Sequence, residues 1–360
     1  MEQKTNLIRV GISIGDVNGI GPEVIIKSLN DHRILQDFIP IIYGSTRTIS
    51  YHKKLINEDD FNYQSCKNAE EAILNKVNII NVWNDEIKFD LGQVSESGGK
   101  YAFMALERAT QDLASNKIDV LVTAPICKEA IKLADFNFPG HTEYLAHLSN
   151  VDDALMMMVS PILKVALVTS HIPLKEVSAA LTKEKISAKL TALEQTLKKD
   201  FGLLKPRIAV LGLNPHAGEN SQLGNEENDI IKPVIKQHFD NGALIYGPYP
   251  ADGFFGSSLF TKFDAVLGMY HDQVLTGFKA LTFDEGVNYT AGLPIVRTSP
   301  DHGTAFDIVG KGIASPNSFR NAIYLAIDIY KTRKFIKENN TNPLTPQKQT
   351  EIKRRYPSRE

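Results

Sequence analysis

Short apolar runs rich in β-branched residues alternate with longer amphipathic segments along this 360-residue chain, and this alternation constrains the fold more than any other feature. The expected strands are residues 7–14, 38–43, 77–82, 118–123, 164–169, 207–213 and 265–269. Most of these runs are continuously apolar, which is typical of parallel strands that helices cover on both faces.

The segments between the strands carry helical patterns. Residues 97–116 place Ala102, Ala105, Leu106, Ala109 and Leu113 at helical spacing. Residues 183–201 and 316–335 are further expected helices. Alternating strands and helices imply right-handed crossovers and a mostly parallel sheet, so the predicted class is α/β. The length indicates two domains or one large α/β unit.

The charge balance limits the partners of the protein. Lysine and arginine total 40 while aspartate and glutamate total 42, so the formal net charge is −2. A general nucleic-acid-binding protein usually carries a basic excess, and we therefore expect no nucleic-acid partner. A local basic site for a small anion remains compatible with this balance.

Cysteine use and the length of the apolar segments indicate the compartment. Cys66 and Cys127 are far apart, so neither a disulfide framework nor a cysteine-ligated zinc is expected. No apolar window is long enough for a signal peptide or a membrane span, which predicts a cytoplasmic protein with no membrane partner. From Lys337 onward the chain is polar and lacks apolar periodicity, which predicts a flexible tail.

Histidines stand close to the carboxyl ends of several expected strands. His171 closes the segment VALVTSH, His216 lies in NPHAGE, and His271 lies in MYHDQ. Ligands of open α/β sheets bind beyond the carboxyl ends of strands, so these imidazoles could converge. Three neutral imidazoles suit Zn²⁺ or another borderline divalent ion. The alternative is that each is an ordinary surface or capping histidine.

Two carboxylates lie beside this histidine set. Asp252 in GPYPADG and Asp272 in YHDQ could orient ligating histidines or take part in proton transfer. Turn and helix-capping roles are equally available to them.

Glycine-rich and basic segments indicate anion binding. GDVNGIGPEV, residues 15–24, joins an expected strand to a helix start, where Pro22 fits the first turn. It is not the dinucleotide fingerprint GxGxxG, and a plain tight turn explains it equally well. Lys279 and Arg297 could supply donors to a phosphate or carboxylate. Either could instead be a solvated surface charge; Lys279, within an apolar stretch, is the better site candidate.

A long glycine-rich loop spans residues 300–316, PDHGTAFDIVGKGIASP. It could wrap a nucleotide through backbone donors or serve only as a connection, although loops of this length tend to be functional.

Several motifs together resemble the 4-hydroxythreonine-4-phosphate dehydrogenase family. These are GDVNGIGPE, GHTEYL, VTSHIPL, NPHAGE, GPYPAD, YHDQ and GVNYTAGLPIVRTSPDHGTAFDI, in order between Gly15 and Ile308. GIGPE and HGTAFDIVGKGIA also resemble the wider isocitrate and isopropylmalate dehydrogenase superfamily.

The resemblance implies an architecture and a reaction. The fold would be a two-domain α/β/α structure with mostly parallel sheets and a cleft between the domains. The first domain would hold residues 1–135 and about 290–340, the second about 136–289 with the metal-ligand loops, and the flexible tail 341–360. The reaction would be the oxidation of 4-phosphooxy-L-threonine by NAD or NADP, followed by decarboxylation to 3-amino-2-oxopropyl phosphate, in pyridoxine 5'-phosphate biosynthesis. The protein would be a homodimer.

The resemblance also implies site residues. One divalent metal, zinc with magnesium or cobalt as alternatives, would bind His171, His216 and His271, with His271 the ligand expected from the neighbouring subunit. The substrate would bind His141, Thr142, Lys279, Asn288 and Arg297. The cofactor would bind His302, Gly303, Thr304, Ala305 and Asp307. Proton transfer would fall to Lys279, Asp252 or Asp272.

One departure and three rival functions accompany the resemblance. The superfamily usually has Asn-Pro where this chain has Ser315-Pro316, which puts one adenine contact in doubt. The closest rival is a dehydrogenase of another four-carbon phosphorylated hydroxy acid, such as phosphoerythronate or phosphothreonate. The others are a metal-dependent sugar-phosphate lyase or phosphatase and a non-catalytic phosphometabolite-binding protein.

Overall fold

The computed structural model describes residues 7–341 except 135, 137, 139, 152 and 153. The described part of the chain forms a 12-stranded sheet in the order β3-β4-β2-β1-β5-β12-β11-β6-β7-β10-β8-β9. The strands are β1 (Ile8–Ser13), β2 (Phe38–Gly44), β3 (Tyr63–Cys66), β4 (Val77–Asn81), β5 (Val120–Thr123), β6 (Leu155–Val159), β7 (Lys164–Leu167), β8 (Arg207–Leu211), β9 (Leu244–Tyr249), β10 (Ala265–Gly268), β11 (Val287–Ala291) and β12 (Arg297–Pro300).

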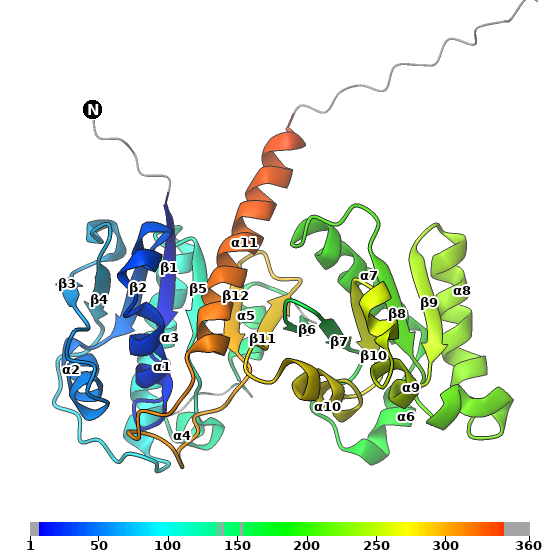
Figure 1. Ribbon diagram of the computed structural model, residues 1–360, viewed down its shortest axis with the longest axis horizontal. Helices are drawn as coiled ribbons and strands as arrows, with labels where there is room; N and C mark the ends of the chain where they lie inside the picture. The colour runs from blue at the N-terminus through cyan, green and yellow to red at the C-terminus, as the bar shows by residue number, and fades with distance from the viewer. Residues whose placement is uncertain (1–6, 135, 137, 139, 152–153, 342–360) are drawn as a thin grey trace, which may run out of the picture.

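The sheet connects two lobes, which Figure 1 shows side by side. β3, β4, β2, β1, β5 and β12 are parallel neighbours in the first lobe. β7, β10, β8 and β9 are parallel neighbours in the second. β11 and β6 run between the lobes and pair antiparallel with each other and with β12 and β7. The predicted α/β class with a mostly parallel sheet is confirmed, whereas the domain boundaries stay a prediction.

Helices cover both faces of the sheet. The α-helices are α1 (Gly21–Leu29), α2 (Thr46–Leu55), α3 (Glu96–Ala114), α4 (Lys128–Leu133), α5 (His141–Leu148), α6 (Val177–Ala180), α7 (Lys183–Lys199), α8 (Lys232–Asp240), α9 (Ala251–Phe255), α10 (His271–Thr282) and α11 (Asn317–Asn339). All three expected helices are present as α3, α7 and α11. α3 and α7 begin where Ser95 and Thr182 accept a backbone N–H, as N-caps do.

Two apolar cores follow from the alternation of side chains along the strands. Met157 and Ala166 face the large core that runs through both lobes. Their neighbours Met158 and Val165 face a smaller core of the second lobe, under α9 and α10. This alternation gives the second lobe apolar contacts on both faces of its strands, as a doubly covered sheet requires.

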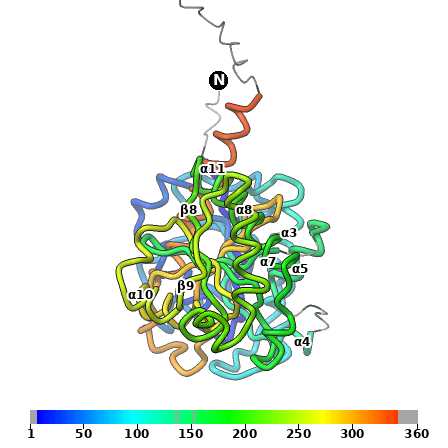
Figure 2. The backbone as a smooth tube through the Cα atoms, turned by 90° about the vertical axis from the view of Figure 1, so that its right-hand side faces the viewer, coloured from blue at the N-terminus to red at the C-terminus, as the bar shows by residue number. Residues whose placement is uncertain are grey.

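The last helix extends beyond the body of the molecule. α11 packs against β12, β5 and β11 over its first part, and its C-terminal part projects outward (Figures 1 and 2). The predicted start of the tail at Lys337 is wrong, because α11 continues to Asn339. The rest of the predicted tail, residues 342–360, lies outside the described residues. No helix within the described ranges is long and apolar enough to cross a membrane.

Candidate functional site

A cavity of about 250 Å³ lies where the two lobes meet. Its wall consists of the loops after β5, β12 and β7, the last of which carries His171, together with residues of β6, β11 and β12. α5 adds its first turn. The cavity brings together predicted residues from three of the four functional sets, namely His141, Thr142, Asn288 and Arg297 for substrate, His302 and Gly303 for cofactor, and His171 for metal.

Arg297 is the buried cation of this cavity, with only 3% of its surface exposed. It donates hydrogen bonds to the hydroxyl of Thr123 (2.6 Å from Nη2), the hydroxyl of Thr290 (3.0 Å) and Nδ1 of His141 (3.2 Å). Burial lowers its pKa to about 10, so it stays charged at neutral pH. Within the described ranges it has no carboxylate at ion-pair distance, and such a cation favours binding of an anion.

The bond from Arg297 determines which nitrogen of His141 carries the proton. A guanidinium can only donate, so Nδ1 of His141 accepts and the neutral ring carries its proton on Nε2. Burial and the Arg297 charge hold the pKa of His141 well below its usual value, which keeps the ring neutral. Nε2 is therefore a donor, and it is buried without a partner.

Two more lining residues carry buried polar atoms without a partner. They are Oδ1 of Asn288 and Nε2 of His302. Nδ1 of His302 donates to the carbonyl of Gly303 at 3.0 Å, so Nε2 of the neutral ring is an acceptor. Buried polar atoms are normally satisfied, and three orphans around one cavity indicate a polar ligand with both donors and acceptors.

His171 and His271 lie together in one chain, with ring centroids 5.9 Å apart. Both follow the carboxyl ends of neighbouring parallel strands, β7 and β10. Nδ1 of His271 lies 2.6 Å from Oδ1 of Asp272 and donates to it, which leaves Nε2 free, as in many metal-ligating histidines. Burial, and next the Lys128 charge, lower the pKa of His171, which favours the neutral, ligating form.

The third predicted ligand does not join this pair. Among the residues that the structure describes, no three His, Cys, Asp or Glu side chains gather at metal-binding distance. His216 lies in a run of left-handed residues after β8, where its φ is 53°. The buried carboxylate of Glu227 holds the segment directly before this run by accepting the backbone N–H groups of Leu213 and Asn214, each at 2.7 Å.

The ligand expected from a neighbouring subunit was His271, but the structure places that residue beside His171. Within one chain it is His216 that stands apart. Two imidazoles with available nitrogens fit a borderline divalent ion, which then needs at least one more donor from the substrate or from another chain.

The three proton-transfer candidates lie in different surroundings. Lys279 on α10 is half exposed, and its Nζ lies 3.1 Å from Oδ1 of Asp301. Asp272 is exposed and bonded to His271. Asp252 lies at the exposed start of α9. None of the three is among the residues that line the cavity.

The predicted cofactor loop packs on the glycine-rich loop after β1. The backbone N–H of Ile20 donates to the carbonyl of Thr304 at 3.0 Å. A Cβ on Gly19 would come within 2.8 Å of that carbonyl, so the contact needs glycine. Ala305 has a φ of 42°, and the loop reaches the cavity at His302 and Gly303. The two segments thus form one surface beside the cavity.

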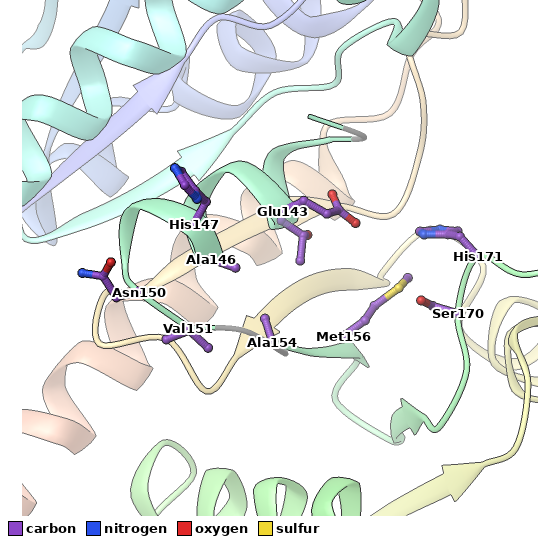
Figure 3. Close-up of a pocket in the computed structure, with 10 residues that line it drawn as sticks. Glu143, Ala146, His147, Asn150, Val151, Ala154, Met156, Ser170 and His171 are labelled. Carbon is purple, nitrogen blue, oxygen red and sulfur yellow. The ribbon is translucent and has the colours of Figure 1, made fainter. Parts of the chain in front are cut away.

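Sequence reasoning did not single out Lys128 and Glu143, which also line the cavity. Glu143 follows His141 and Thr142 in the first turn of α5, and its nearness in sequence to these predicted residues was the signal that could have suggested it. It also borders an adjoining cavity of about 470 Å³, where it and His171 extend toward each other (Figure 3).

An interlobe cavity with a buried cation and unpartnered polar atoms places this chain among two-lobed α/β enzymes that act on small anionic molecules. Residues 36–326 match the model of the family described as pyridoxal phosphate biosynthetic protein PdxA. The chain belongs to this family.

Relatives agree with the assignment. The chain is 49% identical over 343 residues to a 4-hydroxythreonine-4-phosphate dehydrogenase of Bacteroides thetaiotaomicron, covering 95% of this chain and 94% of the relative. It is 40% identical to an Oceanobacillus iheyensis protein named "Putative D-threonate 4-phosphate dehydrogenase", covering 90% and 98%. A crystal structure of 4-hydroxythreonine-4-phosphate dehydrogenase from Klebsiella pneumoniae superposes with a TM-score of 0.77 at 34% identity, covering 91% and 99%.

Proposed function

We propose that this protein oxidises 4-phosphooxy-L-threonine with NAD or NADP in pyridoxine 5'-phosphate biosynthesis. The first product is 2-amino-3-oxo-4-phosphooxybutanoate, which loses CO₂ to give 3-amino-2-oxopropyl phosphate. The observation that carries the proposal is the buried Arg297–His141 pair in a cavity that also holds unpartnered polar atoms. The family and the relatives' names support the same reaction.

The substrate's anionic groups are the natural ligands of this cavity. Arg297 supplies the fixed positive charge, and Nε2 of His141 supplies a directed N–H. Oδ1 of Asn288 accepts a hydrogen bond from a hydroxyl or ammonium of the substrate. Thr142 and Lys279 complete the proposed substrate set. Because these groups are already oriented by the protein, little reorganisation is needed when the substrate binds.

The chemistry needs two additional groups. When bound against His302, Gly303, Thr304, Ala305 and Asp307, the nicotinamide cofactor supplies the hydride acceptor. When bound by His171 and His271, a divalent ion supplies Lewis acidity at the substrate hydroxyl. Asp272 orients His271 for that role through the 2.6 Å bond to Nδ1.

Lys279 is our preferred proton-transfer residue. It is carried by α10, the helix that begins at His271, and it lies beside the loop residues Asp301 and His302. Asp272 is already bonded to His271, and the exposed Asp252 has no contact that leads to the cavity within the described ranges.

The incomplete histidine set favours a site shared by two copies of the chain. We include in the proposal a homodimer in which His216 of one copy completes the metal site formed by His171 and His271 of the other. Glu227 holds the His216 loop in place for such a contact.

A substrate panel tests the reaction. The protein, supplied with a divalent metal, is assayed for reduced nicotinamide with 4-phosphooxy-L-threonine, 4-phospho-D-erythronate and D-threonate 4-phosphate, each with NAD⁺ and NADP⁺. The proposal expects the highest kcat/KM for 4-phosphooxy-L-threonine. A preference for an amine-free substrate overturns it in favour of the rival dehydrogenase, which the Oceanobacillus relative's name supports.

The same panel separates the other rivals. Metal-dependent product formation without reduced nicotinamide would identify a lyase or phosphatase. Tight binding without turnover would identify a phosphometabolite-binding protein.

The metal assignment is tested by His171→Ala. The variant is expected to lose bound metal, measured by elemental analysis after dialysis, and metal-dependent turnover, while its thermal unfolding stays near the parent value. His32→Ala on the exposed 3₁₀ helix His32–Gln36 is the control. Full metal content and activity in His171→Ala would remove this residue from the metal site.

Mixed dimers test the shared site. If His216 comes from the second copy, mixing inactive His171→Ala and His216→Ala chains restores one intact site per mixed dimer. Mixing His171→Ala with His271→Ala restores none. The reverse pattern would mean that His271, and not His216, crosses between subunits.

A further inference from the structure

Asp301 is a mostly buried carboxylate at the border of the site that none of the predicted roles uses. Its neighbours in the chain, Pro300 and His302, both line the cavity. Its side chain is 14% exposed, and burial raises its pKa, while Lys279, His302 and His271 act in the opposite direction. The carboxylate therefore stands among positively charged or chargeable groups of the site.

The position of this carboxylate is built into the first lobe. The backbone N–H of Asp301 donates to the hydroxyl of Ser318 at 2.9 Å, and that hydroxyl donates to the carbonyl of Gly286 at 2.6 Å. A Cβ on Gly286 would lie 2.9 Å from Oδ2 of Asp301, so the glycine leaves the space that the carboxylate fills.

Lys279 approaches this carboxylate from the second lobe. It belongs to α10, whose apolar residues Val274, Leu275 and Phe278 are part of the smaller core. Its Nζ lies 3.1 Å from Oδ1 of Asp301 and 3.5 Å from the backbone carbonyl of the same residue. The contact therefore joins the helix that begins at His271 to the loop that begins after β12.

We propose that Asp301 is a positioning residue that holds the Lys279 ammonium beside the cavity, ready to contact an anionic group of the substrate. A lysine carries four rotatable bonds, and an exposed lysine without a fixed partner would sample many positions. The carboxylate limits that freedom before substrate binds. This inference rests on the proposed function, because the anionic group that Lys279 would contact belongs to the substrate of that function.

The first test measures inorganic phosphate binding by calorimetry in the full-length protein, so it needs no turnover. Asp301→Asn and Lys279→Gln are each expected to weaken phosphate binding about tenfold, the loss expected for one charge-assisted hydrogen bond. The double variant is expected to bind no more weakly than Lys279→Gln alone, because Asp301 acts through Lys279. Additive losses, or unchanged binding in Asp301→Asn, would overturn the proposal.

The second test uses steady-state kinetics with 4-phosphooxy-L-threonine. Asp301→Asn is expected to raise KM about tenfold and also to lower kcat, because Lys279 is the preferred proton-transfer residue, and Asp301→Glu to recover part of both losses. An unchanged KM would contradict a positioning role toward the substrate. Asp240→Asn, which breaks the exposed Lys236–Asp240 pair, is the matched control.

The two hypotheses fail in different ways. Absence of turnover with 4-phosphooxy-L-threonine in the parent protein would reject the proposed function. The phosphate affinities of the two single variants and the double variant would still decide the role of Asp301. If Asp301→Asn unfolds, Asp301→Ser removes the charge with a smaller side chain and supplies the same test; an unchanged phosphate affinity in that variant would overturn the proposal.

Discussion

The guanidinium of Arg297 donates a hydrogen bond to Nδ1 of His141 across 3.2 Å, and both side chains are buried. The bond links the start of β12 to the first turn of α5. It places the imidazole proton on Nε2 and leaves that N–H as an unpartnered donor. One buried cation thereby orients a second group that can bind an anion, so the two side chains should act as a unit.

Replacing Arg297 by lysine should weaken the binding of a phosphorylated substrate. Lysine keeps the charge but loses the planar fork that bonds Thr123, Thr290 and His141. We expect KM for 4-phosphooxy-L-threonine to rise about 10- to 100-fold, the range for one or two charge-assisted hydrogen bonds. KM for the dephosphorylated analogue should change far less.

Steady-state kinetics of both compounds check this prediction, with the exposed Arg207→Lys as the control. An equal rise in both KM values would remove Arg297 from the phosphate site.

Gly19→Ala should act on the cofactor and spare the substrate. The added methyl would lie 2.8 Å from the carbonyl of Thr304, so the predicted cofactor loop must shift. A displacement of about 1 Å in a positioning segment can cost on the order of 100-fold in rate. We expect KM for the nicotinamide cofactor to rise at least tenfold with KM for the substrate nearly unchanged.

Initial-rate measurements with each ligand varied in turn test this assignment. The control is Gly253→Ala, at a position with open space around the added methyl. A selective rise in substrate KM would show that the 304 loop serves the substrate instead.

The sequence predicted most of the continuously apolar strands, but it missed β6, which reads Leu-Met-Met-Met-Val, and the strands β11 and β12 that carry candidate site residues. It also missed the edge strands β3 and β9. β1, β2 and β10 are covered on both faces, so their composition alone indicates buried strands. β12 reads Arg-Thr-Ser-Pro and β11 reads Val-Asn-Tyr-Thr-Ala, without an apolar run. Asn288, Arg297 and Ser299 line the cavity, and such polar side chains interrupt the apolar run that identifies a buried strand.

Burial of the candidate site residues was also hard to predict from the sequence. Lys279 was the better site candidate by its apolar surroundings, yet it is half exposed, whereas Arg297 is fully enclosed. Helical spacing explains the first observation, because α10 is amphipathic and its Lys279 lies on the polar side. Arg297 is buried because β11, β12 and α5 pack together around it. No local sequence pattern predicts this packing.

Asp16 should make the protein less stable as the pH rises from about 4 to about 6. Burial raises the pKa of its carboxyl from 3.8 to about 6, and its Oδ2 has no partner. Below the unfolded pKa both states are protonated and the group is neutral. Above pH 6 both states are ionised, and the folded state alone bears the cost of a buried charge.

Asp16→Asn removes this titration. We expect it to raise the free energy of unfolding at pH 8 relative to the parent, by at most about 3 kcal/mol, and to have little effect at pH 4. Urea unfolding at a series of pH values measures the difference. A gap between the two proteins that does not change with pH would contradict a raised Asp16 pKa.

Arg333→Met should cost far more stability than breaking an exposed ion pair. Nε and Nη2 of Arg333 bond the two oxygens of Asp200 at 2.6 and 3.1 Å, and the hydroxyl of Tyr289 donates to Asp200 at 2.6 Å. The side chains of Arg333 and Asp200 are 12% and 2% exposed. This cluster joins α11 to the end of α7 and to β11, directly behind Asn288.

Removing the arginine leaves the Asp200 carboxylate buried with one neutral donor, which should cost about 3 to 5 kcal/mol of unfolding free energy. Lys198→Met, which breaks the exposed Lys198–Glu194 pair, should cost less than about 1 kcal/mol. The double variant Arg333→Met with Asp200→Leu should recover part of the loss, because no buried charge then remains unpaired. If Arg333→Met and Lys198→Met shift the urea midpoint equally, the buried pair is not what joins the last helix to the second lobe.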